Sequence, residues 1–72
     1  MNKLQQIRKQ RGLSQSQLSE KSHVKLINIQ MYETNKRNIN TAQVNNVYKL
    51  AKAIDVTIEE LLDLEKIEKE VN

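Results

Sequence analysis

The sequence predicts an all-α fold, a compact bundle of five short helices. Apolar residues recur with helical spacing along almost the entire chain. No run of alternating β-branched and polar residues is long enough to predict a strand. The 72 residues include no proline and a single glycine, so little interrupts the helices. A chain of this length forms one small domain, in which every helix must contribute to the core.

The first two helices are separated by a glycine and a polar cap. The first is expected over residues 3–11, followed by Gly12 in the left-handed backbone conformation that often ends a helix. Ser14 begins the second helix, because Gln17 three residues later completes the form of a capping box. Residues 23–24 form the short turn that follows. The residues expected to face the core here are Leu4, Ile7 and Leu18.

The third helix, over residues 25–33, carries apolar residues on more than one face. With Ile29 at the centre of the buried side and about 100° per residue, Leu26 falls toward the core. Ile27 and Met31 then point almost the opposite way. An isoleucine and a methionine exposed one turn apart indicate a surface with a purpose other than folding.

A polar segment, residues 34–40, separates the third helix from the fourth. Asn35 is expected in the left-handed conformation, which Asn tolerates better than most residues. Asn40 and Gln43 are the expected caps of a fourth helix over residues 41–54. The expected buried stripe of this helix is Val44, Val47, Leu50, Ala51 and Ile54.

The fifth helix is expected to run from Ile58 toward the end of the chain. Residues 55–56 form the turn before it, and Thr57 with Glu60 has the form of a second capping box. Its inward residues are Ile58, Leu61 and Leu62. Residues 65–72 are expected to form a helical extension, and Leu64, Ile67 and Val71 are expected to form a further apolar stripe.

The charge is unevenly distributed along the chain. The formal net charge is +3, but residues 1–52 hold ten Lys/Arg and two acidic residues, whereas residues 53–72 hold two lysines and seven acidic residues. A basic body with an acidic end indicates one face that binds a polyanion and another directed elsewhere. A solvated surface with an accidental charge bias is the competing interpretation.

Composition argues against several classes of function. The chain has no cysteine and one histidine, which argues against a disulfide framework, a thiolate metal site and a Ser/His/Asp set. No metal or other cofactor is expected, and the protein is not predicted to be an enzyme. Two tyrosines are the only aromatic residues, too few for the stacking platforms of single-strand or RNA binding. No apolar run approaches the roughly 18 residues of a membrane span, so a soluble, cytoplasmic protein is expected.

Residues 14–33 have the form of a helix-turn-helix, two short helices joined by a tight turn. Four segments in order, "IRKQRGLSQSQLSEKS", "YETNKRNI", "VYKLAKAIDV" and "TIEELL", resemble the lambda-repressor-like (XRE) family of DNA-binding regulators. The resemblance covers about residues 3–64. It implies a five-helix lambda-repressor-like bundle and a sequence-specific regulator, in the first instance a repressor, whose third helix enters the major groove of double-stranded DNA.

The resemblance also implies roles for individual residues. Those at or beside base edges are Gln15, Lys25, Leu26, Ile27, Asn28, Gln30 and Met31. Those at backbone phosphates are Ser14, Asn35, Lys36, Arg37 and Asn38. Arg8 and Glu33 match a pair that the family often joins as an ion pair. The chain departs from the family at His23, where glycine is usual, and at Lys25, which cannot cap a helix through its side chain as Ser, Thr or Asn does.

Two interpretations of the Ile27–Met31 surface remain open. Aliphatic side chains can pack on thymine methyl groups, and Asn or Gln can form bidentate bonds with adenine, which together indicate A·T-containing half-sites. Alternatively, the surface binds a protein, as an antitoxin or anti-repressor-binding module does.

Leu64, Ile67 and Val71 are candidates for the contact of a weak homodimer on DNA.

Overall fold

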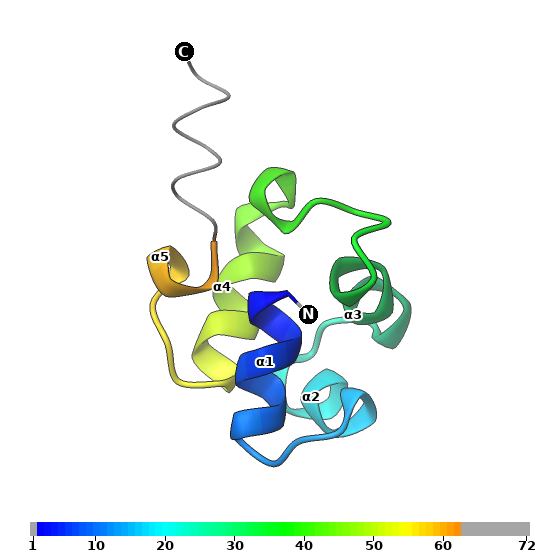
Figure 1. The fold of residues 1–72 in the computed structure, drawn as a ribbon, viewed down its shortest axis with the longest axis vertical. Coiled ribbons are helices and arrows are strands. Elements are labelled where there is room, and N and C mark those ends of the chain that lie inside the picture. Colours follow the sequence, from blue (N-terminus) through cyan, green and yellow to red (C-terminus); the bar gives the residue numbers. More distant parts are fainter. Residues whose placement is uncertain (1, 63–72) are drawn as a thin grey trace.

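The computed structural model describes residues 2–62, which form a small helical bundle (Figure 1). Its elements are α1 (Lys3–Gln10), α2 (Gln15–Ser22), α3 (Leu26–Glu33), the 3₁₀ turn η1 (Ile39–Thr41), α4 (Val44–Ala53) and α5 (Ile58–Leu61). The described residues contain no strand, as the sequence predicts. The extension over residues 65–72, with its stripe from Leu64 onward, lies outside the described residues.

Helix α4 is the centre of the bundle. It packs against α2 on one side and α5 on the other, while α3 packs against α1 and α2 (Figure 1). The core draws side chains from every α-helix and from the turn before α3, and consists of Leu4, Leu18, Val24, Ile29, Tyr32, Val47, Leu50, Ala51, Ala53, Ile54 and Leu61. No described helix has the length and hydropathy needed to cross a membrane.

Local capping chemistry sets most helix ends where the sequence predicts them. Ser14 and Gln17 form the complete capping box at the start of α2. The left-handed positions are Gly12 (φ 71°), His23 (φ 63°) and Asn35 (φ 62°), together with Asp55 (φ 59°). Because His23 carries a Cβ, its left-handed backbone costs free energy that glycine would not.

The prediction for the fourth helix is wrong at its beginning. Residues Ile39–Thr41 form a separate 3₁₀ turn, and α4 begins only at Val44, with no side-chain hydrogen bond from Gln43 as cap. The Asn38 side chain accepts the Asn40 backbone N–H at 2.9 Å, a local alternative to a helical turn. Val44, predicted to be buried, is the first residue of α4 and is 73% exposed.

Candidate nucleic-acid interface

Helices α2 and α3 are held together by the turn between them. The Ser19 hydroxyl donates to the Val24 carbonyl at 2.7 Å, and the Val24 N–H donates to the Ser22 hydroxyl at 3.2 Å. Val24 itself is buried, and α3 anchors its inner side with Ile29, which is fully buried. These contacts fix α3 relative to α2, so the outer side of α3 is a preformed surface.

The outer side of α3 begins with two exposed aliphatic residues. Leu26 is 37% exposed and Ile27 is 52% exposed, whereas Met31 is only partly exposed. The prediction that Ile27 and Met31 form the exposed pair is therefore half wrong, and Leu26 takes the place of Met31. Leu26 is the first residue of the helix, so no earlier turn covers it. The chain after the helix returns toward Met31, with the Arg37 N–H donating to the Met31 carbonyl at 3.2 Å.

The other residues assigned to base edges on α3 differ in accessibility. Gln30 is exposed and Asn28 is half-buried. Lys25 is exposed and occupies the N-cap position without a side-chain hydrogen bond. Because an ammonium group only donates, Lys25 cannot accept the free N–H groups of the first turn. The helix accordingly begins at Leu26, one residue later than predicted.

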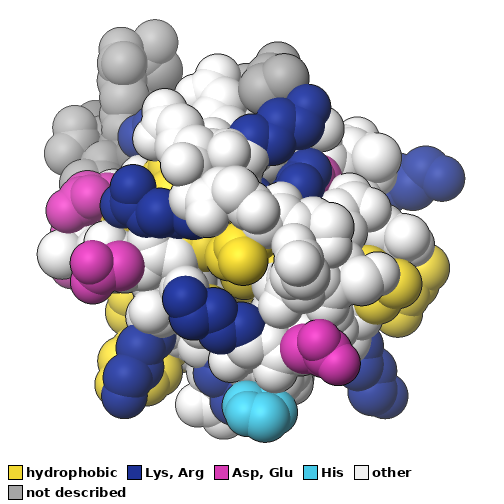
Figure 2. Space-filling model, turned by 90° about the horizontal axis from the view of Figure 1, so that it is seen from below, with side chains coloured by type: hydrophobic (Ala, Val, Ile, Leu, Met, Phe, Trp, Pro, Cys, Tyr) yellow, Lys and Arg dark blue, Asp and Glu magenta, His cyan; other side chains and the backbone are white. Residues whose placement is uncertain are grey.

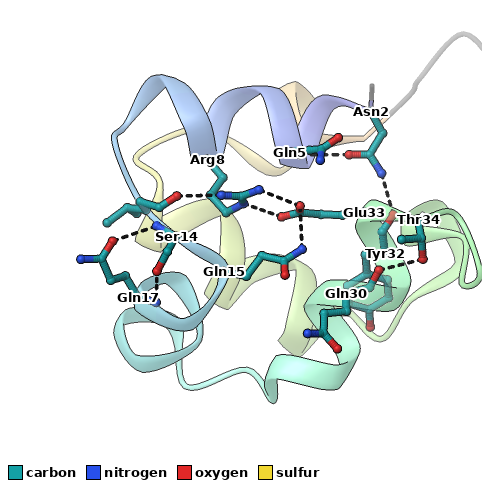
Figure 3. A network of polar contacts seen from close by, with 11 residues as sticks. Asn2, Gln5, Arg8, Ser14, Gln15, Gln17, Gln30, Tyr32, Glu33 and Thr34 are labelled. Atoms are coloured by element: carbon teal, nitrogen blue, oxygen red, sulfur yellow. Dashed lines mark hydrogen bonds and ion pairs between the residues drawn. The ribbon is translucent and has the colours of Figure 1, made fainter.

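The loop after α3 is tied to the beginning of α1. The Asn2 side-chain amide donates to the Tyr32 carbonyl at 2.6 Å and to the Asn35 side-chain oxygen at 3.4 Å. Asn2 also caps α1 through the Gln5 N–H at 3.0 Å (Figure 3). The sequence prediction missed Asn2, although an Asn directly before a helix is a recognised cap signal. It orders the loop that carries Lys36 and Arg37, both exposed.

A polar cleft of about 520 Å³ lies between α3, this loop and the beginning of α4. Its lining residues are Asn28, Tyr32, Arg37, Asn38, Thr41, Ala42, Gln43 and Asn46. Arg37 is the one charged residue of that lining, and the amide and hydroxyl groups around it include several hydrogen-bond donors. A cation surrounded by neutral donors suits an anionic group such as a phosphate.

The predicted pair of Arg8 and Glu33 is present and buried (Figure 3). Arg8 Nε donates to Glu33 Oε2 at 2.7 Å, and Arg8 Nη2 donates to Oε1 at 3.0 Å. The side chains are 9% and 1% exposed, respectively. Arg8 Nη1 also donates to the Leu13 carbonyl at 2.8 Å. The two charges therefore neutralise each other inside the protein and lock α1 to the end of α3.

Gln15, assigned to DNA contact, is part of the same network. The Gln15 side-chain Nε2 donates to Glu33 Oε1 at 3.0 Å (Figure 3). Gln15 is half-buried. Ser14, assigned to a phosphate, uses its hydroxyl oxygen to accept the Gln17 N–H, and its own N–H donates to Gln17 Oε1. The hydroxyl hydrogen of Ser14 remains the donor that it can offer to a ligand.

Basic side chains are distributed widely over the face of the molecule that is seen from below. In the view from below, Lys and Arg side chains appear around the whole of that face, and acidic side chains are fewer (Figure 2). One cation near α1 has a structural contact, because Arg11 Nε donates to the Ile54 carbonyl at 2.8 Å, at the end of α4. Of the two cations in the loop after α3, Arg37 lines the polar cleft.

A family model described as "Helix-turn-helix" matches residues 4–61, most of the chain. No curated protein and no solved structure matches the chain significantly. The matched span begins in α1 and ends with α5, so it includes the buried ion pair, the α2–α3 unit and the loop beside the cleft. This chain belongs to the lambda-repressor-like (XRE) helix-turn-helix family of DNA-binding regulators.

Proposed function

We propose that the protein is a sequence-specific transcriptional repressor that places α3 in the major groove of double-stranded DNA. The observation that carries this proposal is the outer side of α3, where Leu26 and Ile27 are exposed although their helix is rigidly anchored on its inner side. A helix is narrow enough to enter the major groove, and its first residues commonly contact base edges.

Phosphate contacts would come from the two ends of the helix-turn-helix, the loop after α3 and the beginning of α2. Lys36 and Arg37 are exposed in the loop after α3, and Arg37 lines the polar cleft with Asn38. Ser14 stands at the beginning of α2, where free N–H groups and the helix dipole favour an anion. Such contacts set the register of the helix on the duplex, and they carry little information about sequence.

Sequence would be read by a mixture of apolar and amide groups. Ile27, with Leu26 beside it, suits the methyl group of thymine, and Gln30 suits the paired donor and acceptor of adenine. Asn28 is half-buried at the cleft, so it reaches fewer base atoms than Gln30. The preferred half-sites therefore contain A·T pairs.

A weak homodimer would place two such helices on a two-fold site, about 34 Å apart. The residues proposed for this contact, Leu64, Ile67 and Val71, lie outside the described residues. Support comes from a small apolar hollow that Leu62, the residue after α5, helps to line. Leu62 lines a small hollow of about 90 Å³ together with the strongly exposed Val44, and the other lining residues are Ile39, Asn40, Ala42, Val47 and Ile58. An apolar hollow beside an exposed valine suits a self-complementary contact.

Selection from random-sequence duplexes tests the proposal. We expect a recurring A·T-containing site, and an affinity for that site that falls steeply as salt rises, because several phosphates are neutralised. Failure to enrich any site, or duplex binding that is insensitive to salt, would contradict the proposal. The competing function, a protein-binding module that uses Ile27 and Met31, predicts an apolar contact with little dependence on salt. The partial burial of Met31 makes that surface smaller than the sequence indicates.

A further inference from the structure

The orientation of the Gln15 amide is decided by a buried carboxylate. Glu33 Oε1 accepts from both Arg8 Nη2 and Gln15 Nε2, each at 3.0 Å, and the Glu33 side chain is 1% exposed. An ionised carboxylate only accepts hydrogen bonds. If the Gln15 amide were turned over, its carbonyl oxygen would face a carboxylate oxygen, and two acceptors would repel each other. The Gln15 nitrogen must therefore face inward.

This arrangement leaves the Gln15 carbonyl oxygen for an external partner. Among the described residues, no hydrogen bond to that oxygen is present, and no buried side-chain oxygen or nitrogen is left unsatisfied, so the oxygen is open to solvent. Gln15 is the first residue of α2, next to the Ser14 cap, on the helix-turn-helix unit itself. The carbonyl oxygen that Gln15 offers to a ligand at this point is an acceptor, and the amide nitrogen keeps a second N–H beside it.

Phosphate oxygens are acceptors too, so they are poor partners for this atom. In the major groove, the matching donors are the exocyclic amino groups, N6 of adenine and N4 of cytosine. We propose that Glu33 is a positioning residue for DNA recognition, which fixes Gln15 so that its carbonyl oxygen accepts a hydrogen bond from an adenine or cytosine amino group. This inference rests on the proposed function, and it names the atom of Gln15 that reads the base and the residue that orients it.

The orientation is tested first in the unaltered protein without DNA. Nuclear magnetic resonance of the side-chain amides should show slow hydrogen exchange for one Gln15 N–H, because it is bonded to a buried carboxylate. The exposed Gln10 on α1 is the matched control and should exchange at the rate of a solvated amide. A Gln15 amide that exchanges as fast as that of Gln10 overturns the proposal.

The recognition step is tested by selection from random duplexes with three variants, Gln15→Met, Glu33→Gln and the double substitution. Gln15→Met keeps a long unbranched side chain without the amide, and we expect about a 10-fold loss of discrimination at one base pair. Folded Glu33→Gln should lose the same preference, and the double variant should lose no more than either single one. Gln10→Met should select the wild-type site.

The outcomes separate the inference from the proposed function. If Gln15→Met weakens binding equally on all sequences and lowers the salt slope, Gln15 contacts a phosphate and the inference is wrong. If folded Glu33→Gln keeps the preference that Gln15→Met loses, Glu33 does not position the amide. If Glu33→Gln does not fold, the exchange measurement and the Gln15→Met selection decide. If the unaltered protein selects no duplex, the proposed function fails and the inference fails with it.

Discussion

The buried pair of Arg8 and Glu33 should dominate the stability of this small domain. Replacing Glu33 by Gln removes one charge and leaves the Arg8 guanidinium, in a side chain only 9% exposed, without its counter-ion. Breaking a buried pair in this way costs several kcal/mol, since the remaining charge is desolvated and uncompensated. Gln can still accept one hydrogen bond, so we expect a loss near the lower end, about 3 kcal/mol.

A loss of that size is a large share of the total. A domain of 72 residues has an unfolding free energy of about 4 to 11 kcal/mol, and each kcal/mol shifts Tm by about 4–8 °C. Thermal and urea unfolding followed by circular dichroism should therefore show a Tm lower by roughly 12–24 °C. Glu20→Gln is the matched control, because it makes the same substitution at an exposed position of α2, and it should change stability by less than about 0.5 kcal/mol.

A second variant distinguishes a charge effect from general damage. In the double substitution Arg8→Met with Glu33→Leu, no charge is left buried, and we expect much of the lost stability to return. If Glu33→Gln costs less than about 1 kcal/mol, the value typical of exposed pairs, the pair is solvated in solution and this reasoning is refuted.

Four further substitutions test the interface and the fold. Arg37→Ala should weaken binding about equally on all duplexes and lower the salt slope by about one unit, and an altered base preference with an unchanged slope would contradict this. Ile27→Ala should alter preference at one base pair by about 1 kcal/mol or more, while urea unfolding changes little because the side chain is 52% exposed. His23→Gly should raise the unfolding free energy by about 0.5–1 kcal/mol by relieving the left-handed backbone at φ 63°, and a loss of stability would count against that explanation. Ile67→Asp should prevent two copies from assembling on a duplex with two half-sites, as measured by sedimentation, and unchanged stoichiometry and affinity would rule out this residue as a dimer contact.

Features that depend on neighbours a few residues apart can be predicted from the amino-acid sequence alone. The capping box of Ser14 and Gln17 and the left-handed turns at Gly12 and Asn35 follow from local backbone chemistry, so they can be predicted from short segments. The family also follows from the sequence, because its motifs are carried in order along the chain. The resemblance further indicated the pairing of Arg8 with Glu33, which periodicity alone does not.

Features that depend on residues far apart in the chain are set by the packing of the helices. Helical spacing places Val44 on the buried stripe, but packing leaves it at an open end of α4, 73% exposed. The same spacing turns Met31 outward, whereas the folded protein leaves it only partly exposed. Asn2 joins the loop after α3 across 30 residues, and Gln15 joins Glu33 across 18. Hydrogen-bond partners at such separations are set by how the helices pack, and helical periodicity contains no information about the neighbour that each face meets.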